Sequence, residues 1–191
     1  MFFANNGSFG SLVEIARQLR QDGASLSKEA ENVSRFRMDP DSNCLPQGVP
    51  RVAFVPGPWK IVETPNSVVI IYEAFTLWRQ IFTDGREMGP NAYPNWLGYS
   101  TGAWDGDTFV VETRGFNGRI WLDTEGRPST TELHVTERFT RTAFGRMTID
   151  VTIDDPGAYT DLWHASVPFA LQVGWEPLEY ICGENNKIDA Y

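Results

Sequence analysis

The chain has 191 residues, and its 16 Lys and Arg against 25 Asp and Glu give a formal net charge of -9 at pH 7. A negative field of this size repels phosphate, which excludes nucleic acids and anionic membrane surfaces as main partners. No run reaches the roughly 20 apolar residues of a membrane span, and the first residues lack the basic and long apolar regions of a signal peptide. We therefore expect a soluble protein, cytoplasmic as written, or secreted or periplasmic if a leader has been removed.

Aromatic residues are abundant, with seven Trp and twelve Phe. Large flat side chains commonly line small-molecule pockets, so this composition favours a hydrophobic ligand, and an aromatic core is the alternative. The length is that of one domain, which buries roughly two-thirds of the surface exposed by its unfolded chain.

The only helical pattern lies in residues 8–36, where Ser11 is a candidate N-cap and Leu12, Ile15 and Leu19 recur at helical spacing. Residues 39–50 contain three prolines and a glycine, which predicts an extended connector. We therefore divide the chain into residues 1–50, helices and connector that pack on the rest, and residues 51–191, the β domain. A homodimer contact is the alternative role for the helices.

From residue 51 onward, strand patterns alternate with turns. Asp105-Gly106 predicts a tight hairpin, because Asp-Gly supplies the positive φ that such turns need. The predicted strands are 59–63, 67–73, 76–83, 97–104, 108–114, 131–142, 146–154, 163–173 and 178–182. Short hairpins without intervening helices favour a mainly β fold, an antiparallel up-and-down calycin-like β-barrel of eight or nine strands with N-terminal helices at one opening. A two-sheet sandwich of the same strands is the alternative.

The two cysteines, Cys44 and Cys182, flank the predicted strands. They can bridge the ends of the barrel region in an oxidising compartment, or remain as two buried free thiols. Both interpretations stay open at this level.

Several motifs between residues 44 and 184 resemble those of a family of mostly uncharacterised bacterial proteins. They include RQIFTDGRE (79–87), WLGYSTGAWDGDTFVVETRGFN (96–117) and ELHVTERF (132–139). The resemblance implies a barrel similar to the calycins, and it implies no settled activity. Where the family pattern ends in Y-E-Y-x-C-H-E-x-N, this chain has Gly183 in place of the histidine.

Residues 131–142 alternate, with Leu133, Val135 and Phe139 on one face and His134 on the other. We expect His134 to act as a general base or acid, because imidazole titrates near neutrality. Either Glu112, across the strand pair, or Asp123, in the apolar loop after residue 115, is its expected orienting carboxylate or second acid-base group. A hydrogen-bonded structural histidine is the alternative.

The expected substrate-binding residues are two arginines and three aromatic residues: Arg79, Arg138, Tyr72, Trp104 and Trp121. A buried guanidinium must be paired, and Glu73, Glu112 and Glu137 are the candidate partners. Structural pairing competes here with stabilisation of a ligand's carboxylate, phenolate or enolate. The tyrosine either belongs to the core or places its hydroxyl in the cavity.

The chain lacks the motifs of nucleotide binding, of α/β-hydrolases and of dedicated metal sites, so we expect neither cofactor nor metal. The favoured function is a cofactor-independent enzyme of lyase or isomerase type. It would carry out an elimination, dehydration, isomerisation or guided cyclisation on an aromatic or polycyclic substrate held in the barrel. The alternative is a non-catalytic, lipocalin-like carrier of a hydrophobic small molecule.

Overall fold

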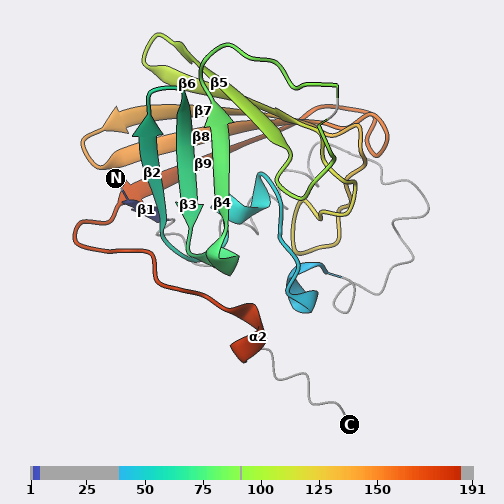
Figure 1. Ribbon diagram of the computed structural model, residues 1–191, viewed down its shortest axis with the longest axis horizontal. Coiled ribbons are helices and arrows are strands. Elements are labelled where there is room, and N and C mark those ends of the chain that lie inside the picture. The colour runs from blue at the N-terminus through green and yellow to red at the C-terminus, as the bar shows by residue number, and fades with distance from the viewer. Residues whose placement is uncertain (1, 5–38, 91, 186–191) are drawn as a thin grey trace.

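The computed structural model describes residues 2–4, 39–90 and 92–185 (Figure 1). The expected helices of residues 8–36 lie outside these ranges. Within them no helix is long and apolar enough to cross a membrane. The elements are β1 (Phe2–Ala4), η2 (Asp41–Asn43), η3 (Arg51–Ala53), β2 (Trp59–Thr64), β3 (Ser67–Tyr72), η4 (Ala74–Thr76), β4 (Trp78–Phe82), β5 (Tyr99–Asp105), β6 (Thr108–Arg114), β7 (His134–Ala143), β8 (Arg146–Asp154), β9 (Trp163–Leu171) and α2 (Cys182–Asn185).

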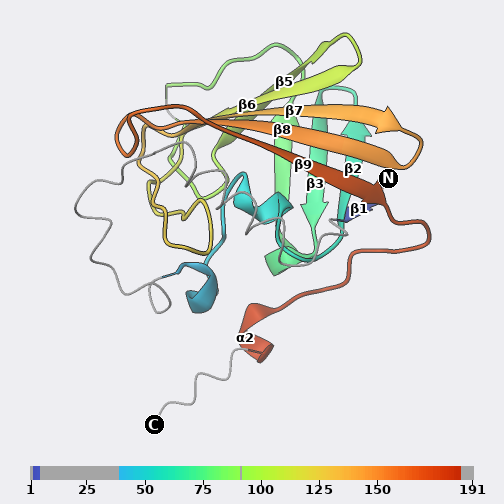
Figure 2. The same ribbon diagram turned by 180° about the vertical axis from the view of Figure 1, so that it is seen from behind.

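The eight strands β2–β9 form one mixed sheet that curls into a half-barrel, which confirms a mainly β fold. In Figure 1 strands β2, β3 and β4 stand in front of β7, β8 and β9 and run steeply across them, and Figure 2 shows the same arrangement from behind. The short β1 pairs with both edge strands, β2 and β9, so the strand order closes on itself. Both sheet faces are therefore defined, one toward an interior and one outward.

The prediction of a wholly antiparallel sheet is wrong at one place, because β4 and β5 are parallel. The connection of residues 83–98 is too long for a hairpin, and a parallel pair requires a long return of this kind. Only two residue pairs, Ile81 with Ser100 and Phe82 with Thr101, join the two strands. This seam is therefore the weakest pairing among the strands from β2 to β9.

Most strand and turn predictions agree with the structure, and β6 and β8 have the predicted bounds. The Asp105-Gly106 hairpin is confirmed, with Gly106 at a φ of 60°. A predicted strand at 178–182 is wrong. Its backbone bonds to side chains instead, from the Leu178 N–H to Glu73 Oε2 and from the Tyr180 N–H to Thr76 Oγ1, and α2 begins at Cys182.

Side chains alternate across the sheet as the pleat requires, and one set forms the interior. On β6 the inward residues are Phe109, Val111 and Thr113, and on β8 they begin with Met147 and Ile149. Phe109, Val111, Met147 and Ile149 belong to a continuous hydrophobic core to which every strand from β2 to β9 except β5 contributes.

Two irregular segments bury apolar side chains inside the barrel, and one of them, the loop of residues 115–133, connects the end of β6 to the start of β7. The loop of residues 115–133 buries Phe116, Ile120 and Leu122, and the segment around η3 buries Phe54 against Phe169 of β9. Gly48 lies so close to Ile120 that a Cβ there would come within 2.5 Å of Ile120 Cγ2. The loop therefore acts as a plug at the end of the barrel where β6 ends and β7 begins.

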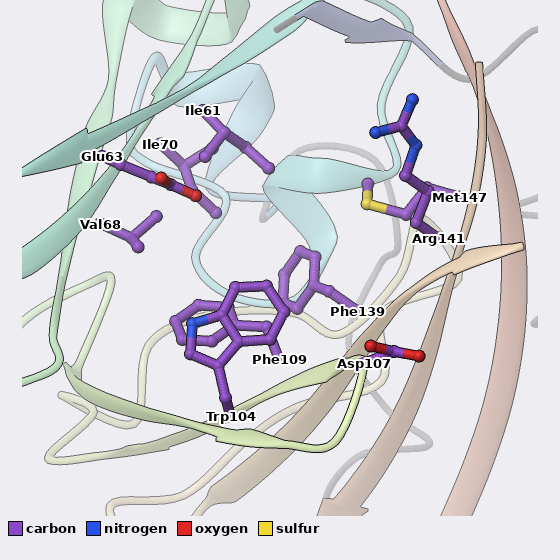
Figure 3. Close-up of a pocket in the computed structure, with 10 residues that line it drawn as sticks. All are labelled: Ile61, Glu63, Val68, Ile70, Trp104, Asp107, Phe109, Phe139, Arg141 and Met147. Atoms are coloured by element: carbon purple, nitrogen blue, oxygen red, sulfur yellow. The ribbon is translucent and has the colours of Figure 1, made fainter. Parts of the chain in front are cut away.

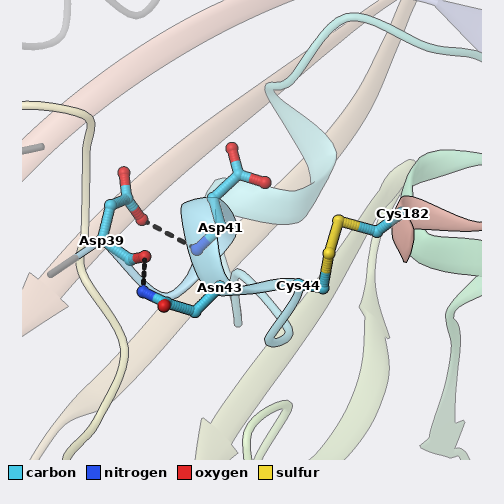
Figure 4. The surroundings of a disulfide bond; sticks show 5 residues. All are labelled: Asp39, Asp41, Asn43, Cys44 and Cys182. Carbon is cyan, nitrogen blue, oxygen red and sulfur yellow. Dashed lines mark hydrogen bonds between the residues drawn. A yellow bond between two sulfur atoms is a disulfide. The ribbon is translucent and has the colours of Figure 1, made fainter. Parts of the chain in front are cut away.

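Cys44 and Cys182 form a disulfide, which decides between the two alternatives left by the sequence (Figure 4). The bond joins the turn after η2 to the start of α2 across 138 residues. Near it, the Thr76 hydroxyl donates to the Tyr180 carbonyl at 2.8 Å, and the Phe75 and Tyr180 rings lie 5.6 Å apart. The segment after β9 is thus held along η4 at its far end.

Candidate functional site

A cavity of about 430 Å³ opens at the end of the barrel that carries the β2–β3, β5–β6 and β7–β8 turns; we call it the barrel pocket (Figure 3). It lies where inward positions at the ends of six strands face one another. Its lining consists of Ile61, Glu63, Val68, Ile70, Trp104, Asp107, Phe109, Phe139, Arg141 and Met147.

The walls of the barrel pocket are apolar, and its charges lie on exposed parts of the rim. Trp104 is 63% exposed at the mouth, and its ring lies 5.2 Å from that of Phe109, which in turn lies 6.2 Å from Phe139. Figure 3 shows these three rings together on one side, with Arg141 and Met147 on another. A hydrophobic guest would thus meet aromatic faces at the entrance and at the floor.

Below the floor, five polar side chains from five strands form a buried group that we call the interior cluster: Tyr72, Arg79, Ser100, Thr113 and Glu137. Arg79 Nε donates to Ser100 Oγ at 2.9 Å, and Nη2 donates to Thr113 Oγ1 at 2.6 Å. Nη2 also lies 2.6 Å from Glu137 Oε2, in an ion pair with side-chain exposures of 2% and 0%. The expected burial of Arg79 and its pairing with Glu137 are both confirmed.

Several atoms of the interior cluster have no hydrogen-bond partner in the part of the chain that the structure describes. They are Tyr72 Oη, Arg79 Nη1 and both oxygens of Glu137: the Arg79 guanidinium interacts with both Tyr72 and Glu137, but without the alignment of a full hydrogen bond. Burial raises the pKa of Tyr72 to about 12, an effect that Arg79 opposes and Glu137 reinforces. Burial also disfavours the charged form of Arg79, but Glu137 and Tyr72 outweigh it and raise the pKa of Arg79 overall.

A second cavity of about 430 Å³ lies at the seam where β4 and β5 separate. Its lining includes Arg79 and Ser100 of the interior cluster, together with Trp78 and Tyr99. The seam cavity therefore reaches two members of the interior cluster, whereas none of the five lines the barrel pocket.

His134 and Glu112 form the predicted cross-strand pair, with His134 Nε2 in contact with Glu112 Oε2. They lie on the outer face of the sheet, because Val135 and Phe139 take the inward positions of β7. Arg114 Nη2 lies 3.4 Å from His134 Nδ1 on the same face. A role for His134 as an acid or base inside the barrel does not fit this placement.

Asp123 and Trp121 lie in the plug loop and not along the barrel pocket. Asp123 is 1% exposed and forms an ion pair with Arg127, and its Oδ1 accepts a 2.8 Å hydrogen bond from the backbone N–H of Glu125. Trp121 is half-buried and packs over Gly126. These contacts show that both residues stabilise the conformation of the plug loop.

Arg138, predicted to bind substrate, points outward with His134, and its Nη2 lies 2.8 Å from Asp105 Oδ2 in an exposed ion pair away from the barrel pocket. Of the five residues predicted to bind substrate, the structure brings Trp104 to the pocket mouth, and Tyr72 and Arg79 into the interior cluster.

Sequence reasoning considered Glu137 only as a partner for an arginine and gave Ser100 and Thr113 no role. The sequence contains one signal for this buried carboxylate, because Glu137 shares its strand face with the apolar residues Leu133, Val135 and Phe139. A charged residue in such a row needs an interior partner. Ser100 and Thr113 carry no comparable sign, since single hydroxyl residues are common in strands.

Comparison of the chain with models of known protein families, with curated proteins and with solved structures found no match. Among residues 2–4, 39–90 and 92–185, no group of three or more His, Cys, Asp or Glu is placed to hold a metal ion. The barrel pocket and the interior cluster are therefore the features of the described residues that bear on function.

Proposed function

We propose that the protein binds a hydrophobic small molecule, aromatic or polycyclic, in the barrel pocket, as a carrier does. The observation that carries this proposal is an open cavity of about 430 Å³ whose walls are aliphatic and aromatic. Small-molecule sites typically measure roughly 300–1,000 Å³ and are lined mainly by such side chains. Charges confined to the rim leave the depth of the pocket suited to an apolar guest.

The wider proposal of a calycin-like barrel has partial support. A strand order that closes on itself and a ligand-sized cavity at one end of the barrel agree with it. The parallel pairing of β4 with β5 departs from an up-and-down barrel. The disulfide favours an oxidising compartment, and thus the secreted or periplasmic alternative for localisation.

A second candidate function is acid-base conversion of the bound molecule without a cofactor: elimination, dehydration, isomerisation or cyclisation. The Tyr72 hydroxyl favours it, because it is a protonated group inside the barrel beside a guanidinium. Arg79 is placed to stabilise negative charge near that hydroxyl. Mass spectrometry of each bound compound after incubation with the protein separates this candidate from a pure carrier.

Binding is tested with phenanthrene, an uncharged three-ring hydrocarbon, titrated against the protein by fluorescence. Trp104→Ala removes one aromatic wall, and we expect affinity to fall about tenfold, since burial of one ring and its stacking contribute about 1–2 kcal/mol. Trp78→Ala is the matched control, because Trp78 is also 63% exposed but lines the seam cavity. His134→Ala serves as an outer-face control.

Saturable binding that depends on Trp104 and not on Trp78 supports the proposal. An equal loss of affinity in Trp104→Ala and Trp78→Ala would show that the ligand does not bind in the barrel pocket. If the unaltered protein shows no saturable binding, the proposed function is wrong.

A further inference from the structure

We propose that the interior cluster recognises a hydroxyl group of the ligand, so that the ligand is an uncharged aromatic hydroxyl compound of two or more rings. This inference rests on the proposed function, because it places the apolar rings in the barrel pocket and only the hydroxyl in the cluster. It adds a second, polar subsite and a chemical class for the ligand.

The unpartnered atoms of the interior cluster define which group fits. Arg79 Nη1 can only donate hydrogen bonds, ionised Glu137 can only accept them, and the Tyr72 hydroxyl can do both. A single hydroxyl accepts from Arg79 Nη1 and donates to Tyr72 Oη or to Glu137. An ether accepts but cannot donate, so it leaves the carboxylate unpaired.

The charge balance of the cluster favours an uncharged group over an anion. Glu137 already faces Arg79 with 2.6 Å between Oε2 and Nη2, and both side chains are fully buried or nearly so. A ligand carboxylate next to Arg79 would also lie close to Glu137 in surroundings of low dielectric constant, where like charges repel strongly. The cation is thus neutralised before the ligand arrives.

The cluster lies one inward position below the floor of the barrel pocket. On β3 the inward residue next to Ile70 is Tyr72, and on β7 the inward residue next to Phe139 is Glu137. Two residues along a strand span about 7 Å, the length of one to two fused rings. A ligand that parts the Phe109 and Phe139 rings therefore reaches the cluster while its remaining rings stay in the apolar pocket.

Unsatisfied buried polar atoms are uncommon and costly, and several that face one another in one place indicate a binding site better than a packing accident. Ser100 and Thr113 hold two of the guanidinium nitrogens, Nε and Nη2, at fixed positions. The third nitrogen, Nη1, is thereby presented in a defined direction. This pre-organisation distinguishes the cluster from a solvated surface pair.

The test compares 2-naphthol, its methyl ether 2-methoxynaphthalene and the anion 2-naphthoate by calorimetry at pH 7, where 2-naphthol is uncharged. We expect 2-naphthol to bind at least about tenfold more tightly than either analogue, since a site built for a hydroxyl discriminates strongly against compounds without it. Tyr72→Phe should reduce the preference for naphthol over the ether about fivefold and leave ether binding unchanged.

Tyr159→Phe is the matched control, because Tyr159 is also buried but donates to the Pro128 carbonyl in the plug loop. It should leave the preference unaltered. Equal binding of naphthol and ether, or tighter binding of naphthoate, overturns the inference while the proposed function stands. An unchanged preference in Tyr72→Phe also overturns it and indicates a water-filled cluster. Binding of none of the three compounds overturns both proposals.

Discussion

Removal of Glu137 is expected to be the most destabilising change to the interior cluster. At the 2.6 Å separation of Arg79 Nη2 and Glu137 Oε2, two unit charges attract by about 6 kcal/mol at an effective dielectric constant of 20. Desolvation costs several kcal/mol for each ion and offsets most of that attraction. The ion pair as a whole therefore contributes little to the free energy of unfolding. Glu137→Leu, however, leaves a buried cation unpaired and should lower the free energy of unfolding by about 3–5 kcal/mol.

The double variant Arg79→Met with Glu137→Leu removes both charges and should recover most of that loss, because packed apolar side chains often replace a buried pair without penalty. Urea unfolding followed by tryptophan fluorescence gives the free energy of unfolding for each variant. The control is Arg138→Met, which breaks the ion pair with Asp105 on the outer face of the same strand. That pair is exposed, so the change should alter stability by less than about 1 kcal/mol.

The double-mutant cycle decides whether the reasoning holds. If the losses of the two single variants add in the double variant, the ion pair has no coupling energy and the charges do not depend on each other. If Glu137→Leu lowers the free energy of unfolding no more than Arg138→Met does, water enters the interior of the barrel and the cluster is not a site of low dielectric constant. Glu137→Gln, with a smaller change in shape, replaces Glu137→Leu if that variant does not fold.

Two further predictions concern pH and redox conditions. Because burial raises the pKa of Tyr72 from about 10 to about 12, its contribution to stability is present below pH 10 and is lost between pH 10 and 12. Raising the pH from 8 to 11 should therefore lower the free energy of unfolding by about 1–1.5 kcal/mol less in Tyr72→Phe than in the parent protein, as measured by urea unfolding; the control is Tyr93→Phe, because Tyr93 is 89% exposed. The disulfide closes a loop of 138 residues in sequence separation, so Cys44→Ser with Cys182→Ser should lower stability by about 2–4 kcal/mol. A reductant should destabilise the parent protein and leave that variant unaffected; equal sensitivity of both would contradict the prediction.

Local patterns sufficed for most of the fold. Asp105-Gly106 predicts a hairpin because its conformation depends on the turn residues themselves, and β8 follows from strict alternation over nine residues. The parallel pairing of β4 and β5 depends on how a long connection returns, which no neighbouring residues specify. The apolar residues after β9 suggest a strand, but the backbone N–H groups of this segment bond to the side chains of Glu73 and Thr76, which a local pattern does not reveal.

The candidate site was harder to predict because alternation separates two faces without saying which is inside. Glu112 and His134 do meet across β6 and β7, as the sequence predicted, but on the outer face. The inward face carries Glu137, and only the assembled barrel shows that Arg79 reaches it from β4 on the other side of the parallel seam. A pair formed by residues on strands that are not neighbours leaves no spacing pattern in the sequence.

The division of polar residues between the two faces bears on function. The outer pairs, of His134 with Glu112 and of Arg138 with Asp105, are partly solvated, and such pairs contribute little to stability. The interior pair also gives little net stability, yet it occupies space that apolar side chains could fill. Its presence beneath an apolar pocket is explained if the walls supply affinity and the cluster fixes the orientation of the guest. On this argument, apolar substitution of Arg79 and Glu137 together would yield a stable protein that still binds hydrocarbons and no longer distinguishes a hydroxyl from an ether.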